Sequence, residues 1–537
     1  MKIKRTLALM LALLLFAGVF AGCAKTETPA AATPASEDKT EAPAAEKTET
    51  PAAVEASGDE IVVKFARPEE IATWDPLNNN AIVNSIHNNM VYDGLFQQDV
   101  NYNILPCLAE SYEVSDDNLT ITFHIVKGVK FHNGDDLTAH DVFVTYNRLL
   151  EPDCALTQKS NFACLEGLKE IDDYTIEFQL NTPNAYLFTL LCKPIINGRL
   201  FEEMGEDCFE LNIGTGPYKY VEWKPGVSIE YVKNEDYWQG ETSNVDRVFY
   251  IPLMEDTTRT SAVRTGDCDM VDSIPTDQVP TLEAEGLNVM KAMTCDQLYI
   301  GYQFQPGPKA TGVMADKNVR LAFSMAIDRE AIANEILGSG RAATFPVGEG
   351  GKGFDANYPG RTYDPEKAKE LLANSSYNGE TIRVIGPTAN YEKITETMTA
   401  IYYYLTAVGF NVDMEQLENA AFSDARKAGE YDCYIVGASF GGGDGYNFIN
   451  QRIVGDSLAS HYGNEELNEM ILATNGIMDD TARCEALKGV YTKIMDDCAP
   501  MDFIVQYQFN YVFNNRIKSV DANGSKAIDL STIWVNE

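Results

Sequence analysis

Residues that alternate between apolar and polar predict short strands throughout the first half of the chain. The run Leu119-Thr120-Ile121-Thr122-Phe123-His124-Ile125 has the pattern of a half-buried strand, in which every second side chain faces a core. Further strands are predicted over 61–65, 174–180, 216–223, 227–232 and 246–251. Apolar residues at helical spacing predict helices over 81–95 and from Thr138 to Leu150. The first half is therefore expected to be rich in strands.

From about residue 318 the periodicity becomes helical, and the predicted helices alternate with strands. Asp364-Pro365 is a helix start signal, because Asp can cap the first turn and Pro fits the first helical position. The patterns predict helices over 318–337, 365–372 and 391–408, and strands over 381–385, 431–436 and 507–513. This alternation predicts an α/β architecture.

The first 23 residues have the features of an export signal. A basic start is followed by an apolar run over 7–20, which is too short for a stable membrane-spanning helix. The run ends in Phe20-Ala21-Gly22-Cys23, which resembles a bacterial lipobox, although lipoboxes more often have Leu at the position of Phe20. We expect a lipoprotein signal peptide over 1–22 and acyl chains such as palmitate on Cys23. The alternative is an ordinary signal peptide followed by an incidental Cys.

The segment that follows is rich in Ala, Thr, Pro and Glu and contains no aromatic residue up to Asp59. It includes a duplication, in which residues 25–31 recur as residues 47–53. Such a composition cannot bury enough apolar surface to offset the entropy of ordering, so we expect a disordered tether over 23–59. As a flexible coil it would span roughly 30–36 Å.

Composition places a strong acidic excess on the remaining, globular part. The 537 residues include 42 Lys+Arg and 80 Asp+Glu, which gives a net charge of −38, and −36 of this lies beyond residue 59. This balance argues against nucleic acid as a partner, because phosphate binding needs a basic surface. A solubilising acidic surface is the simplest interpretation. No second run of 18 or more apolar residues follows, so no further membrane span is expected.

Two motifs suggest chemistry that their surroundings do not support. Gly437-Ala438-Ser439-Phe440-Gly441 fits the G-x-S-x-G pattern of a nucleophile elbow, but the glycines that follow are unsuited to the helix that an elbow requires. The only later histidine is His461. A secreted esterase that uses Ser439 is therefore a remote alternative, and a Gly-rich loop that approaches a ligand closely is the simpler interpretation.

Evenly spaced histidines raise the possibility of a metal site. They are His124, His132 and His140, and the first two lie in Phe-His segments for which we expect a structural role. The sequence has no H-E-x-x-H motif, no C-x-x-C pair and no phosphate loop of the G-x-x-x-x-G-K-[ST] type. Ten cysteines remain besides Cys23, and the sequence leaves open whether they pair or stay free. We expect no metal, no cofactor and no catalytic residue.

A series of short motifs follows in a fixed order along the chain. They are Tyr92-Asp93-Gly94-Leu95, Leu108-Ala109-Glu110-Ser111-Tyr112, Lys127-Gly128-Val129-Lys130-Phe131-His132-Asn133-Gly134, Leu137-Thr138-Ala139, Gly214-Thr215-Gly216-Pro217-Tyr218, Asn234-Glu235-Asp236-Tyr237-Trp238, Arg320-Leu321-Ala322, Ala326-Ile327-Asp328-Arg329 and Tyr363-Asp364-Pro365. In this order they resemble the extracellular solute-binding proteins of family 5, which include the oligopeptide-, dipeptide- and nickel-binding components of ABC importers. Each motif is weak alone, and the resemblance extends from about residue 60 to the end.

The resemblance implies an α/β fold of the periplasmic-binding-protein type, a two-lobed clamp with mixed sheets that closes on its ligand about a hinge. It implies a first lobe over 60–302 with an extra subdomain over about 104–207. The second lobe would cover 303–504, and residues 505–537 would return to the first lobe.

The resemblance also identifies candidate ligand-binding residues. Dipeptide-binding members hold the peptide carboxylate with an Arg and place an aromatic two residues later; these positions fall on Ala389 and Tyr391. The Asp that holds the peptide amine falls on Gly441, while Asp444 matches a following Asp and is either an amine ligand or a solvated turn residue. A peptide terminus buried without a partner is costly, which disfavours a strict dipeptide binder.

Other candidates are placed near the cleft by family position alone, and each could equally serve packing or a turn. They are Asn79, Asn80, Gln303, Phe440 and Tyr446.

The expected function is that of a monomeric substrate-binding lipoprotein, which captures an oligopeptide or similar extended solute and delivers it to an ABC permease with its ATPase. It would be anchored at the outer face of the cytoplasmic membrane, or periplasmic if an outer membrane exists. A peptide-pheromone or sensor receptor and an oligosaccharide-binding protein on the same fold are the alternatives.

Overall fold

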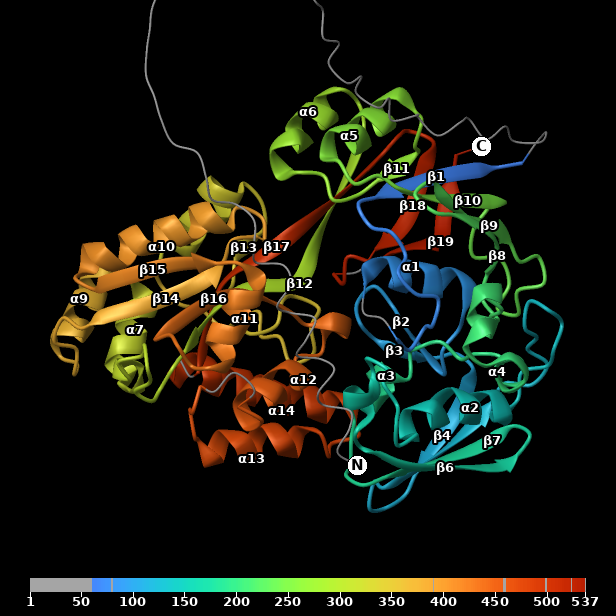
Figure 1. Ribbon diagram of the computed structural model, residues 1–537, viewed down its shortest axis with the longest axis horizontal. Helices are drawn as coiled ribbons and strands as arrows, with labels where there is room; N and C mark the ends of the chain where they lie inside the picture. Colours follow the sequence, from blue (N-terminus) through green and yellow to red (C-terminus); the bar gives the residue numbers. More distant parts are fainter. Residues whose placement is uncertain are drawn as a thin grey trace, which may run out of the picture. The chain divides into compact units, whose positions relative to one another are not determined.

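The computed structural model describes residues 60–78, 81–389, 391–456, 460–497, 500–522 and 524–536 (Figure 1). The predicted signal peptide, Cys23, the tether, Asn79 and Asn80 lie outside these residues. Among the helices of this described part, none is both long enough and apolar enough to cross a membrane.

A large mixed sheet runs through the molecule, with the strand order β15-β14-β16-β12-β17-β11-β1-β10-β9-β8 and with β13 added beside β17. Its strands are β1 (Val62–Arg67), β8 (Tyr218–Lys224), β9 (Ser228–Lys233), β10 (Arg247–Pro252), β11 (Met270–Val271), β12 (Asn288–Tyr302), β13 (Arg341–Ala342), β14 (Thr381–Pro387), β15 (Asn411–Leu417), β16 (Cys433–Ser439) and β17 (Met501–Phe513). β1 is parallel to β10 and β11, and β14 is parallel to β15 and β16. The remaining pairs are antiparallel.

The two longest strands, β12 and β17, connect two parts of this sheet (Figure 1). Residues 288–293 of β12 pair with the C-terminal half of β17, which also pairs with β11. Residues 297–301 of β12 pair with the N-terminal half of β17, and this part of β12 also pairs with β16. The register between β12 and β17 is irregular from Met293 to Gln297. We call the part with β1 and β8–β11 the first lobe, the part with β14–β16 the second lobe, and the irregular stretch the hinge.

The second lobe is an α/β layer. α7 (Lys317–Met325), α9 (Pro365–Ala373) and α10 (Ile394–Val408) place apolar side chains against the strands, and the core includes Ile382, Ile401 and Ile435. Asp364 caps α9 through its bond from the Lys367 amide (2.8 Å), as the sequence predicts.

A second core of this lobe lies under the helical C-terminal region. α11 (Asn419–Lys427), α12 (Tyr446–Ile449), α13 (Glu465–Thr474) and α14 (Asp480–Asp497) surround it, and Tyr299, Tyr491 and Phe503 are buried within it.

Residues 104–207, predicted as a subdomain, contain a separate antiparallel sheet of order β4-β5-β7-β6. Its strands are β4 (Ala109–Val114), β5 (Thr120–Ile125), β6 (Leu165–Asp172) and β7 (Thr175–Leu180). α2 (Ala139–Leu150) packs on it, beginning with a capping box between Thr138 and Asp141.

Smaller elements complete the chain. They are α1 (Ile82–Val91), β2 (Phe96–Gln98), β3 (Ile104–Pro106), α3 (Leu187–Leu190), α4 (Gly198–Met204), α5 (Asp256–Thr265), α6 (Val279–Ala284), α8 (Arg329–Ala331), β18 (Ile517–Ala522) and β19 (Ile528–Val535).

Three of the sequence motifs meet at one buried carboxylate. Asp93 accepts hydrogen bonds from the Thr215 hydroxyl (2.8 Å), the Tyr237 hydroxyl (3.0 Å) and the Trp238 indole (2.9 Å). Burial raises the pKa of Asp93, and these three donors oppose that rise. The motifs are therefore structural, and the bonds hold the segment after α1 extended, which explains why this helix ends at Val91 rather than at the predicted residue 95.

The predicted helix over 318–337 is present in two pieces, because the chain turns at residues 326–328, between α7 and α8, to bury Arg329. The guanidinium of Arg329 donates to the Ser324 carbonyl (2.9 Å) and the Phe503 carbonyl (2.7 Å) and pairs with Asp502. A straight helix would break these bonds. The other predicted strands and helices are present, with ends shifted by a few residues, and β17 begins six residues earlier than predicted, at Met501.

Candidate ligand-binding cleft

Residues from both lobes line a cavity of about 240 Å³ beside the hinge. The first lobe contributes the loop after β11, and the second lobe contributes Glu392 from the connection between β14 and α10. β17 forms the side between them. The lining residues are Ser273, Ile274, Pro275, Glu392, Gln508, Phe509 and Asn510. We call this space the hinge cavity.

The first-lobe side is held by a buried ion pair between Arg67 and Asp272, at the ends of β1 and β11. Arg67 also donates to Glu69 through Nε (2.9 Å). Burial raises the pKa of Asp272 to about 6, against the attraction of Arg67. Burial also lowers the pKa of Arg67, but the attraction of Asp272 and Glu69 outweighs it and leaves this pKa above its usual value. The pair therefore fixes the loop that carries Ser273.

A second ion pair crosses the hinge itself, between Asp296 of β12 and Lys526 of the β18–β19 connection. The ammonium of Lys526 and the guanidinium of Arg67 each lie 5.8 Å from the centre of the Phe509 ring. Both cations beside this ring are thus already matched with carboxylates.

The second-lobe side carries Tyr391 and Glu392, two residues that precede α10. The predicted helix over 391–408 begins only at Ile394, because Lys393 has a left-handed backbone (φ 48°) and its ammonium donates to the Ile336 carbonyl (2.7 Å). Tyr391 lies against Gly437, where an added Cβ would sit 2.1 Å from the Tyr391 ring. Glu392 is exposed, with no hydrogen bond or ion pair to any residue that the structure describes.

The Gly-rich loop after β16 lies elsewhere in the second lobe and is closely packed. Phe440 is buried against Phe448 (ring centres 4.8 Å apart), and Gly441 begins the 3₁₀ turn Gly441–Gly443. Tyr446 is buried, and its ring lies 6.3 Å from that of Tyr186, which comes from the chain leading into α3.

Asp444 is neither a free amine ligand nor a solvated turn residue, as the two sequence hypotheses had it. It is 2% exposed, and its carboxylate accepts from both terminal nitrogens of Arg483 (2.5 and 3.3 Å). It also accepts from the Tyr446 amide (2.9 Å). Because burial without a partner is costly for a carboxylate, Arg483 supplies the partner that this buried position requires.

Gln303 is not brought together with these residues. It lies just beyond the end of β12, on the far side of the strand from the hinge, and is buried. Its backbone amide donates to Asp432 (2.9 Å), and its side-chain oxygen accepts from the Gln305 amide (3.2 Å). Its contacts in the structure are those of a packing residue.

Several contacts join the lobes directly. Gln98 donates from its side chain to the Gly442 carbonyl (2.9 Å), and Thr276 and Ser339 share a hydroxyl–hydroxyl bond (3.1 Å). The Ala185 amide donates to the Asn475 carbonyl (2.8 Å). The structure thus shows a state in which the lobes touch.

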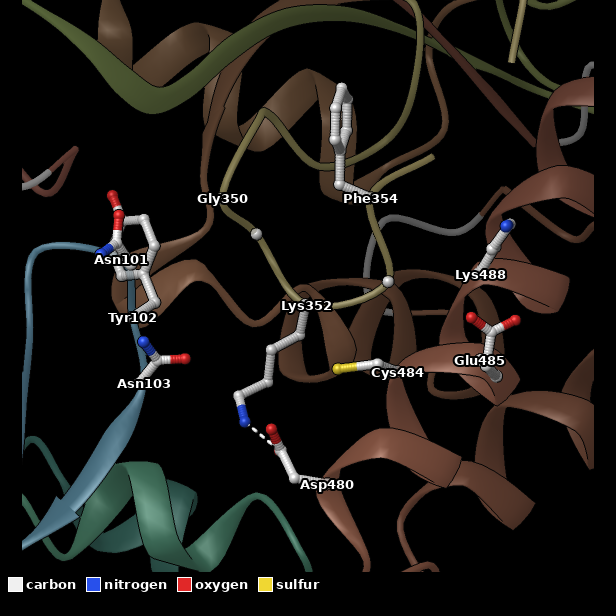
Figure 2. Close-up of a pocket in the computed structure, with 12 residues that line it drawn as sticks. Asn101, Tyr102, Asn103, Gly350, Lys352, Phe354, Asp480, Cys484, Glu485 and Lys488 are labelled. Atoms are coloured by element: carbon white, nitrogen blue, oxygen red, sulfur yellow. Dashed lines mark hydrogen bonds and ion pairs between the residues drawn. The ribbon is translucent and has the colours of Figure 1, made fainter. Parts of the chain in front are cut away.

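A second cavity, of about 190 Å³, lies between the loop after β2, the Gly-rich segment 350–354 and α14 (Figure 2). We call it the loop cavity. Lys352 reaches across it to form an ion pair with Asp480 (Figure 2). Lys488, which also lines it, pairs with Asp355 (3.4 Å). Its two lysines are therefore already paired with acids of the chain.

The G-x-S-x-G motif and the evenly spaced histidines do not form a catalytic or metal-binding arrangement in the described part of the chain. Ser439 ends β16 with an exposed side chain and is followed by the 3₁₀ turn, while His461 pairs with Asp456 (3.1 Å). His132 contacts the Gly216 carbonyl (2.9 Å), and His140 pairs with Glu170 (3.1 Å). No cluster of metal-ligating side chains occurs among these residues.

Comparison with known proteins decides the family. The sequence profile of the bacterial extracellular solute-binding proteins, family 5 Middle, matches residues 103–455, well over half of the chain. The chain belongs to this family.

Its relatives within the family bind different solutes. The chain is 28% identical to heme-binding protein A of Haemophilus influenzae over 457 residues, covering 76% of this chain and 79% of that protein. It is 24% identical to the oligopeptide-binding protein AppA of Bacillus subtilis over 546 residues, covering 96% and 95%.

Solved structures of family members confirm the two-lobed fold. HbpA2 from Haemophilus parasuis gives a TM-score of 0.80 at 21% identity, covering 89% of this chain and 100% of that one. AppA from B. subtilis in complex with a nonapeptide gives a TM-score of 0.68 at 23% identity, covering 89% and 100%.

Two features of this solute-binding protein were missed from sequence. Glu392 adjoins Tyr391, which family position had identified, so an acid next to that aromatic was the available signal. Arg483 lies 39 residues from Asp444, and no local pattern connects the two.

Proposed function

We propose that this solute-binding protein captures an extended peptide, or a solute of similar shape, between its lobes and delivers it to an ABC permease. It acts as a monomer held at the membrane by acyl chains on Cys23. On the second-lobe side of the proposed site, Tyr391 lies beside β16, and Phe440, Gly441 and Tyr446 would bound the site where the Gly-rich loop follows the end of β16. Asn79 and Asn80 would lie on the first-lobe side.

The observation that carries this proposal is the incompletely paired edge of β16. β14 pairs with β16 only through Cys433 and Tyr434, whereas β12 pairs with it as far as Ser439. Residues 435–439 therefore have a strand on one side only in the described part of the sheet. An extended peptide can add to such an edge through main-chain hydrogen bonds, which recognise peptides largely independently of their sequence.

The edge adjoins the hinge cavity. Tyr391 lies against Gly437 of β16, with its hydroxyl 3.5 Å from the Gly437 carbonyl, and the next residue, Glu392, lines the cavity. A solute in this position would contact both lobes, and ligands shift a clamp toward closure only through contacts that are better in the closed state.

A strict dipeptide site is not supported. Ala389 stands where dipeptide-binding members have their Arg, and Asp444 is occupied by Arg483. A longer peptide that is held by its backbone needs neither an Arg at its carboxylate nor an Asp at its amine.

Native mass spectrometry of protein purified without refolding tests the proposal first, by identifying any co-purified solute. A thermal-shift screen then compares peptides of four to eight residues with the same peptides N-methylated at alternate residues, and with oligosaccharides. We expect stabilisation by the unmodified peptides and a weaker effect of the N-methylated ones, because they lack backbone donors. Stabilisation by oligosaccharides alone would overturn the peptide assignment.

The anchor and the transport role need separate measurements. Cys23→Ala is expected to move the protein from the membrane fraction to the soluble fraction. Uptake of a bound peptide that depends on both this protein and a permease would distinguish import from sensing.

A further inference from the structure

The charges around the hinge cavity do not balance. Three cations, Arg67, Arg259 and Lys526, stand against the carboxylates of Glu69, Asp256, Asp272, Asp296 and Glu392. The first four carboxylates are engaged by those three cations. Glu392 remains without a cationic partner in the part of the chain that the structure describes.

The surroundings of Glu392 are those of a binding site rather than of an open surface. Ile274, Pro275 and Phe509 supply apolar walls, and Gln508 and Asn510 supply amides. Apolar walls weaken the screening of a charge by water, so an interaction with Glu392 is stronger here than on a flat surface.

β17 carries a buried, unpaired hydroxyl two residues before Phe509 of the lining. The Tyr507 hydroxyl is buried and has no hydrogen-bond partner within the described residues. Burial raises the pKa of Tyr507, and the charges of Tyr391, Glu392 and Asp296 raise it further. Buried polar groups in proteins are normally hydrogen-bonded.

We propose that the hinge cavity binds an organic cation, a primary ammonium or a guanidinium group, with Glu392 as its counter-ion. This inference rests on the proposed function, in which the cation is the amino terminus or a basic side chain of the captured peptide. Among the carboxylates of the cleft, Glu392 takes the role that Asp444 cannot, because Arg483 already neutralises Asp444.

The position of Glu392 also connects this recognition to closure. Glu392 belongs to the second lobe, whereas Ser273, Ile274 and Pro275 belong to the first. The walled cavity therefore exists only when the lobes meet, and a cation bound there favours the closed state.

Binding measurements on the full chain test the proposal with matched peptides. One hexapeptide is offered with a free and with an acetylated amino terminus, and with Lys or with norleucine at one internal position. We expect removal of the cation that contacts Glu392 to weaken binding about tenfold. The peptide that shows this loss identifies whether that cation is the amino terminus or the Lys side chain. Glu392→Gln should remove that preference and leave binding of the peptide that lacks both cations unchanged.

Two further variants keep the result interpretable. Glu396→Gln removes an exposed acid one turn into α10 that does not line the cavity, and it should retain the full preference. Glu392→Lys reverses the charge and should reverse the preference toward the peptide without cations. Equal weakening of all peptides by Glu392→Gln would overturn the inference and leave the proposed function intact.

Cations that contain no peptide bond test the cation site independently of peptide capture. A linear diamine and an alkylguanidine are titrated against wild-type protein and Glu392→Gln by native mass spectrometry. Glu392-dependent binding of these cations without binding of any peptide would support the cation site and reject peptide capture. Failure of both the cations and the peptides to bind would overturn both.

Discussion

Asp444 and Glu392 are both acids of the second lobe, the first placed near the cleft by family position and the second by the structure, yet their surroundings differ completely. Asp444 is buried and held by two nitrogens of Arg483. Glu392 is exposed, lines the hinge cavity and has no partner among the residues described. The difference shows that the position of an acid near a cleft does not determine whether it can receive a ligand, because a distant residue such as Arg483 already neutralises some of these acids.

Paired and unpaired acids occur in both cavities. In the loop cavity each lysine of the lining has an acid of the chain as its partner, whereas Glu485 has none among the described residues. In the hinge cavity Glu392 is the carboxylate without a partner among these residues. The predictions below test this distinction from the largest expected effect to the smallest.

Arg483→Met should cost the most stability, about 3–5 kcal/mol in the free energy of unfolding, because it leaves the Asp444 carboxylate buried without its partner. Denaturant titration measures the loss. The double variant Arg483→Met/Asp444→Leu should recover a large part of it, since both charges are then gone. A loss below about 1 kcal/mol in the single variant would show that the pair is unimportant and would break the comparison.

Gly443→Ala should destabilise the closed state by about 1–3 kcal/mol. Gly443 has a left-handed backbone (φ 66°), and an added Cβ would sit 2.5 Å from the Tyr102 ring. Tyr102 follows β2, so this collision opposes the approach of the Gly-rich loop to that segment, and ligand affinity should fall with it. Gly489→Ala in α14 is the matched control. An added Cβ meets nothing within 4 Å there, and Ala should stabilise the helix.

Gln98→Ala should weaken ligand binding by a few fold while leaving thermal stability nearly unchanged. The Gln98 side chain makes one hydrogen bond to the Gly442 carbonyl, and such a bond contributes about 0.5–1.5 kcal/mol. Calorimetric titration of a bound peptide measures the effect. Gln97→Ala, which removes the exposed neighbouring amide, should have none, and equal effects of the two variants would contradict a role in closure.

Glu392→Gln should change the free energy of unfolding least, by less than about 0.5 kcal/mol, because an exposed side chain without a partner contributes little to stability. The variant matters for ligand binding alone. Destabilisation as large as that of Arg483→Met would mean that Glu392 has a structural partner after all.

Local signals predicted local structure well. The alternation in 119–125 gave β5, and Asp364-Pro365 gave the start of α9, because both depend on neighbours in the sequence. β12 was missed because residues 288–302 change their surroundings along the strand, from partly exposed at one end to buried at the other, so they show no single period.

The family resemblance predicted the fold and gave Tyr391 as a candidate, but it could not predict the charge partners. The helix over 318–337 is interrupted because Arg329 pairs with Asp502, a residue far away in the sequence. The Asp444 hypotheses failed for the same reason. Periodicity and motifs carry no information about which distant side chain completes a buried pair.

The position of β17 has a consequence for how the protein reaches its folded state. This strand pairs with β12 in both lobes, and also with β11 and β13, yet it is formed by residues 501–513 of 537. Neither half of the main sheet can be completed until residues 501–513 have been made. Non-local pairing of this kind slows folding and leaves unpaired strand edges exposed meanwhile. Truncation before residue 501 should therefore yield an aggregating chain rather than one intact lobe.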